Sequence, residues 1–169
     1  THQLLPGAAL SGAGTVGVSA GQVNLADGTI HQLTGTTNVS GGQVVAAGSL
    51  ATLSADRSLA GSFLTQTGGV VTAGADGLAI GPHTLTTSAD AVFDLAGGSF
   101  STTNGSHLVS LGGGALNLGG PVLVMAGGAP TVSIAGAVLH VASTVTTANA
   151  GNVVSVAAGM LTSDAELIR

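Results

Sequence analysis

Apolar and small polar residues alternate along the chain in short runs that begin and end at glycine. In the stretch from Ser19 to Ile30, Val23 and Leu25 are separated by one polar residue, which is the period of two of a strand that buries one face. This stretch contains the pattern Gly-x-Φ-x-Φ, where Φ is usually apolar, at residues 21–25. The pattern returns, in places loosely, at residues 42–46, 69–73, 98–102, 114–118, 136–140 and 151–155. Because the spacing of the copies is uneven, we expect coils of unequal length.

Further short runs rich in Val, Leu, Ile and Thr predict additional strands at residues 14–18, 30–33, 50–53, 78–80, 91–95, 107–111, 121–125, 131–134 and 141–145. The dipeptides Asp27-Gly28, Asp76-Gly77 and Asn104-Gly105 predict turns, because these residue types tolerate a positive φ. Glycine interrupts every helical periodicity except at residues 163–167, which predict a short turn in the tail.

Many short strands fit either a β-sandwich or barrel or a stacked solenoid. A sandwich or barrel uses longer antiparallel strands. The apolar residues here are mainly Ala, Val and Leu with three Phe, which suits a narrow coil filled by small side chains. Coils of about 20 residues, a length within the solenoid range, predict seven to eight coils. The predicted fold is therefore all-β, a parallel β-helix in one stacked domain.

The low charge of the chain excludes several functions. Charged residues make up 5% of the sequence, and Arg57 and Arg169 are the only Lys or Arg residues, so a basic nucleic-acid-binding surface is excluded. Cysteine is absent, which removes disulfides and thiolate metal sites. The apolar segment at residues 122–141 contains Pro130 and two glycines in a row, and this argues against a transmembrane span. The chain starts without Met, and we expect a processed form or an excerpt of a longer protein.

Residues 9–16 and 35–44 carry a family resemblance. Their sequences, ALSGAGTV and GTTNVSGGQV, resemble the repeats of bacterial autotransporter passenger domains and of filamentous-haemagglutinin-type adhesins. The second half of the chain shares only the Gly-x-Φ-x-Φ pattern. The resemblance implies a right-handed parallel β-helix that is displayed outside the cell.

Candidate catalytic and metal-binding residues are few and scattered. The histidines lack the close spacing of metal ligands and are expected in turns or at the surface: His2, His31, His83, His107 and His140. Asp90 and Asp94, with Asp76 further back, are the only acids that suggest paired-carboxylate or calcium chemistry on adjacent coils.

Two further patterns are weaker. Residues 74–78 match half of a calcium-binding nonapeptide, but such sites need consecutive copies. Threonines cluster at residues 36–37, 84–87, 102–103 and 144–147. Stacked hydroxyl rows can order water, and the unequal spacing argues against a regular array here. No serine lies in a G-x-S-x-G motif.

The combined prediction is a structural protein and not an enzyme, with no catalytic, cofactor or metal residues. Residues 1–10 are expected to form an apolar N-terminal segment or a cap or contact strand, residues 11–162 the solenoid and residues 163–169 a C-terminal tail. A solenoid has open strand edges at its ends, and this chain has few charges to protect them. We therefore expect a secreted or cell-surface subunit of a bacterial fibre or surface matrix that polymerises through its ends and apolar faces, with host or matrix glycans as further partners. The alternatives are a piece of a monomeric adhesin stalk and a β-helix enzyme that acts on polysaccharide.

Overall fold

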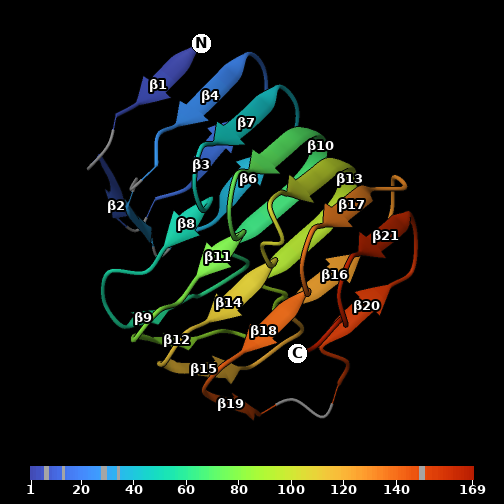
Figure 1. Cartoon of the computed structure of the whole chain (residues 1–169). Helices are drawn as coiled ribbons and strands as arrows, with labels where there is room; N and C mark the ends of the chain where they lie inside the picture. Colours follow the sequence, from blue (N-terminus) through green and yellow to red (C-terminus); the bar gives the residue numbers. More distant parts are fainter. Residues whose placement is uncertain (6–7, 13, 28–29, 34, 149–150) are drawn as a thin grey trace.

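A computed structural model describes residues 1–5, 8–12, 14–27, 30–33, 35–148 and 151–169. These residues form parallel strands that stack as a β-solenoid, and none of them is helical (Figure 1). The prediction of a parallel β-helix is confirmed. No helix in the described part is long and apolar enough to cross a membrane.

The first two coils are narrow and contain three strands each. They comprise β1 (His2–Leu4), β2 (Ala9–Gly12), β3 (Val16–Val18), β4 (Gln22–Leu25), β5 (Ile30–Leu33) and β6 (Thr37–Val39). His2 pairs with Val23, and Val23 pairs with Val44, so the two narrow coils are equal in length. We refer to residues 1–42 as the narrow region.

The turns of the remaining chain are wider, each with a fourth side (Figure 1). Their strands are β7 (Gln43–Ala46), β8 (Ala51–Thr52), β9 (Arg57–Ser58), β10 (Leu64–Ala73), β11 (Leu78–Ala79), β12 (Thr84–Thr86), β13 (Phe93–Thr102), β14 (Val109–Leu111), β15 (Ala115–Leu118), β16 (Leu123–Met125), β17 (Thr131–Ile134), β18 (Leu139–Val141), β19 (Thr144–Thr147), β20 (Val154–Val156) and β21 (Met160–Ser163). We refer to residues 43–169 as the wide region.

Coil length in the wide region departs from the prediction. The partner pairs Gln43–Val70, Val70–Ser99 and Ser99–Thr131 show that each of these coils is longer than the one before it, and that all three are longer than the narrow coils. The predicted count of seven to eight short coils is therefore wrong, because most coils have four sides. The predicted inequality of the coils is confirmed.

Inward-facing residues form continuous columns through the solenoid. One column contains Val44, Val71, Phe100 and Val132, which are buried and directly paired from coil to coil. Phe93 lies outside this column and contacts both Phe63 and Phe100 edge to face. The centroid distances are 5.4 and 5.5 Å. The three phenylalanines thus form one cluster in the core of the wide region.

The glycines of the repeated pattern lie at one corner of the coil. Gly42 and Gly69 have φ of 69° and 72° and occupy equivalent positions in successive coils. A Cβ on Gly69 would lie 2.6 Å from the carbonyl oxygen of Gly42, so only glycine fits. β4 and β7 begin directly after this corner, as the pattern predicts. In β10 and β13 the strand runs through the corner, with register shifts.

Several local predictions need correction. The strand predicted at residues 141–145 is the end of β18 and the start of β19, separated by a bend at Ala142 and Ser143. Ser163 is the last residue of β21, and the predicted helical turn is replaced by bends at Asp164, Ala165 and Leu167, followed by a bridge between Leu139 and Ile168.

The turn dipeptides behave differently from one another. Asn104 and Gly105 both have positive φ, as predicted, whereas the glycine of Asp76-Gly77 does not. The turn at Asp27-Gly28 includes a residue outside the described ones.

Candidate functional site

The C-terminal end exposes a position that is buried elsewhere in the solenoid. Leu95 and Met125 stack as inward-facing residues of successive coils, and their exposed fractions are 1% and 0%. Val156 continues this column on β20 and is 47% exposed. Met160, Leu167 and Ile168 are also exposed near this end. The core column thus reaches the surface here as an apolar patch.

Both ends also have open strand edges. Among the described residues, β19, β20 and β21 each pair with one strand, on the side of the preceding coil. At the other end, β1, β2 and β3 pair only with the next coil, and Leu5 is exposed beside them. Such edges offer unpaired N–H and C=O groups to a further parallel strand.

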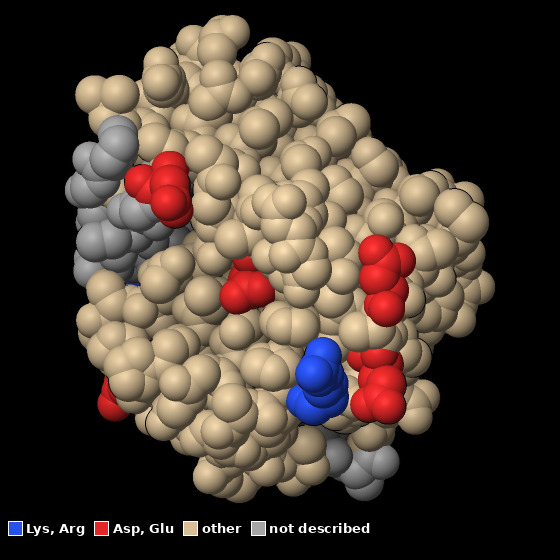
Figure 2. All heavy atoms as spheres, in the orientation of Figure 1, with Lys and Arg blue, Asp and Glu red and all other residues tan. Residues whose placement is uncertain are grey.

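The surface between the ends is nearly free of charge. Figure 2 shows one face, where a few acidic side chains and a basic group that lies beside one of them are set in an otherwise uncharged surface. No Asp, Glu, Lys or Arg occurs between Leu95 and Ser163. Charges therefore contribute little to repulsion between copies of this chain.

Two of the histidines lie together, which their spacing in the sequence did not predict. His107 and His140 stack with ring centroids 4.4 Å apart and planes 10° from parallel. Nδ1 of His107 accepts a hydrogen bond from the backbone N–H of Ala137, and Oδ1 of Asp76 accepts one from the backbone N–H of His107, both at 2.8 Å. Burial is the largest effect on the pKa of His107 and lowers it below its usual value of 6.5.

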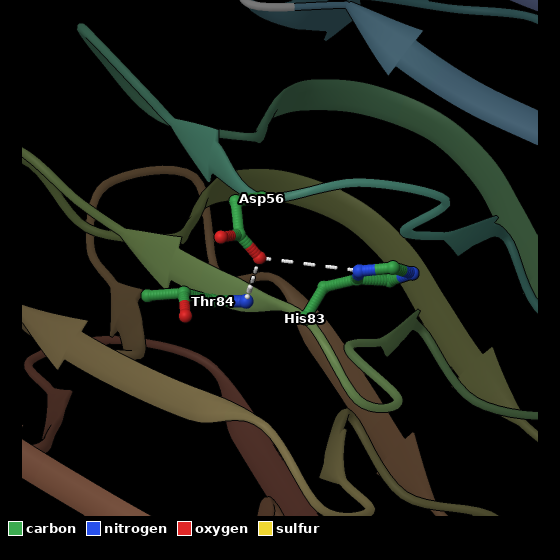
Figure 3. Close-up of polar contacts among 3 residues, drawn as sticks. All are labelled: Asp56, His83 and Thr84. Atoms are coloured by element: carbon green, nitrogen blue, oxygen red, sulfur yellow. Dashed lines mark hydrogen bonds and ion pairs between the residues drawn. The ribbon is translucent and has the colours of Figure 1, made fainter.

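His83 lies in a different contact, on the side of the solenoid that carries β9 and β12 (Figure 3). Nδ1 of His83 is 3.9 Å from Oδ1 of Asp56, and the same oxygen accepts a hydrogen bond from the backbone N–H of Thr84 at 2.8 Å. Asp56 is largely exposed, so this pair is a weak tie between two coils. His2 lies on β1, and His31 lies on β5, where its side chain is outside the described part.

The three candidate acids act separately. Asp76 receives the N–H of His107, Asp90 accepts a hydrogen bond from the hydroxyl of Ser88 at 3.2 Å, and Asp94 faces outward on β13. The half calcium motif at residues 74–78 comprises the connection between β10 and β11 and the first residue of β11. Within the described residues, no three His, Asp or Glu side chains are placed to hold a metal ion.

Two of the predicted threonine clusters are joined in a row across three coils by Asn117. Asn117 donates from Nδ2 to the hydroxyl of Thr86 at 3.4 Å, and its Oδ1 accepts from the hydroxyl of Thr146. A hollow of about 250 Å³ lies along this row. The strands of this row stay in register although the coils are unequal in length, because the loops absorb the extra residues.

These features define the class of the protein as a charge-poor parallel β-solenoid with open edges and an apolar C-terminal end. The chain matches no protein-family model, no curated protein and no solved structure.

Proposed function

We propose that the chain is a structural β-solenoid subunit of a bacterial fibre or surface matrix outside the cell, which associates with further copies through its ends. The main support is the column of Leu95, Met125 and Val156, whose last member is a core residue exposed to solvent. Covering about half of a valine side chain contributes on the order of 1 kcal/mol, and hydrogen bonds from the open edges add to it.

The extracellular location rests on the sequence resemblance to passenger domains and adhesins, together with the low charge. The runner-up function is a segment of a monomeric adhesin stalk. In that case further coils of a longer chain cover the same apolar end, and the isolated chain does not form fibres of its own.

A pair of substitutions on one strand tests the proposal. Val156 faces inward at the end of its column, whereas Ser155 faces outward on the same strand. A lysine at Val156 (Val156→Lys) places a charge on the apolar end, and Ser155→Lys adds the same charge on the side of the solenoid. We expect wild type and Ser155→Lys to form filaments in electron micrographs and Val156→Lys to stay as short particles.

Circular dichroism checks that both variants keep the β-rich spectrum of the wild type. Sedimentation velocity over a range of concentrations gives an independent measure of association. A wild-type chain that remains monomeric at high concentration contradicts the proposal and favours the stalk. Equal filament formation by both variants contradicts the assignment of the C-terminal end as the interface.

A further inference from the structure

The stacked histidines join two coils close to the C-terminal end. His107 lies in the loop before β14, and His140 lies in the middle of β18 on the next coil. The bond from the N–H of Ala137 to Nδ1 of His107 ties the loop before β18 to the preceding coil. This bond and the stack add to the parallel backbone pairing of β18 with β14.

The bond also sets the tautomer of the neutral His107 ring. Nδ1 accepts a hydrogen bond only through its lone pair, so the neutral ring carries its proton on Nε2. A proton that binds at Nδ1 takes this lone pair and converts the acceptor into a donor. The N–H of Ala137 then faces an N–H group, and the bond breaks.

The groups around His107 oppose its protonation on balance. Burial and His140 lower the pKa of His107, Asp76 raises it, and Arg169 lowers it further. The net effect is a pKa below the usual value of 6.5. Since the unfolded chain takes up the proton first, this contribution to stability is complete above about pH 6.5 and is lost as the pH falls through the lowered pKa of the folded state.

The segment bonded to β18 carries two of the exposed apolar residues of this end, Leu167 and Ile168. The backbone N–H of Leu139 donates to the carbonyl of Leu167 at 3.0 Å, and the N–H of Val141 donates to the carbonyl of Arg169 at 2.7 Å. Ile168 lies between these two bonds and forms a bridge with Leu139. Loosening β18 therefore releases residues 167–169.

We propose that the His107–His140 stack is an acid-released latch on the C-terminal coil. Protonation of His107 breaks its bond to Ala137 and places a positive charge against His140 and Arg169, and β18 then separates from residues 167–169. The consequence for assembly, which rests on the function proposed above, is that acid disrupts the end through which copies associate.

Amide hydrogen exchange in the whole chain tests the latch directly. We expect exchange at Ala137, Leu139 and Arg169, corrected for the intrinsic effect of pH, to rise about tenfold between about pH 7.5 and about pH 5. Amides of β10 and β13 serve as the internal reference and should change less. Equal changes in both sets, or none at Ala137, overturn the proposal.

Two variants separate the proton from the packing. In His107→Asn, the side-chain oxygen replaces Nδ1 as the acceptor and does not titrate in this range, so the acid response at Ala137 should disappear. His140→Phe keeps a stacked ring without a charge and should reduce the response. His83→Asn, on another side of the solenoid, is the control and should retain it in full. A full response in His107→Asn, or in His140→Phe if the first variant does not fold, overturns the latch.

Sedimentation velocity of the same samples distinguishes the proposed latch from the proposed function. If the exchange response is present but the chain never associates, the latch stands and the proposed function fails. If filaments form equally at both pH values, the link between latch and assembly is wrong.

Discussion

The narrow and the wide regions bury their interiors to very different extents. Among the described residues of the narrow region, Val18, Leu25 and Val39 are the buried apolar side chains, whereas the wide region contains the phenylalanine cluster and most of the core. An apolar cavity of about 40 Å³ lies where the regions meet, lined in part by Val18, Val44 and Phe63. A short three-sided coil thus packs less completely than a four-sided one, and solenoid stability depends on such local contacts.

The boundary between the regions is also where two new sheets begin. β8 and β9 are the first strands of the two four-stranded sheets. Arg57 on β9 occupies the column of Leu85 and Leu116, at the open edge of its sheet. Burial lowers the pKa of its guanidinium from the usual value. A charged residue at this position discourages pairing with another strand.

Truncation of core side chains should give the largest difference in lost stability between the two regions. Phe93→Ala removes the central ring of the cluster and should lower the free energy of unfolding by about 3–5 kcal/mol. Val18→Ala, in the first narrow coil, should cost about 1–2 kcal/mol. Urea denaturation measures both values. Similar losses would show that the two regions are equally well packed.

Substitution of the corner glycines should give a smaller difference in stability between the two regions than truncation of the core. Gly69→Ala forces a positive φ on alanine and an overlap with Gly42, with costs of about 1–2 and about 1–3 kcal/mol respectively. Gly21→Ala forces the same positive φ on alanine, but a Cβ there meets nothing within 4 Å. It should therefore lower the free energy of unfolding by only about 1–2 kcal/mol. Thermal unfolding of the two variants compares them, and equal shifts would contradict the close-approach argument.

The smallest effect is expected on the outer surface of the wide region. Asn117→Ala removes side-chain bonds to Thr86 and Thr146 at an exposed position and should cost about 0.5–1 kcal/mol. In the narrow region, the side chain of Gln22 donates to Asn24 on the same strand, so Gln22→Ala should cost less. The difference is measurable by denaturant midpoints at constant slope. A larger loss for Gln22→Ala would mean that the row at Asn117 does not tie coils together.

The fold was predictable because every coil repeats the same local pattern. The period of two at Val23 and Leu25 and the recurring corner glycines are properties of neighbouring residues. Coil length was not predictable in this way. The loops hold a variable number of residues, and nothing local to Val70 or Ser99 indicates which strand of another coil it will join.

The histidine pair was missed for the same reason. His107 and His140 lie further apart in the sequence than Val109 and Leu139, which are direct partners on the adjacent strands. Even the correct register would have pointed to Ser110 as the neighbour of His140, since His107 reaches it from a loop. Contacts made by loops depend on tertiary structure that a repeat pattern does not encode.

The change from three to four sides gives the molecule a taper, with its slender end at β1 and its broad end at β19 and β20 (Figure 1). The two ends of a tapered rod differ, so the rod has a direction. Any filament in which such rods follow one another would be polar, would differ at its two tips, and would show a waist once in every subunit.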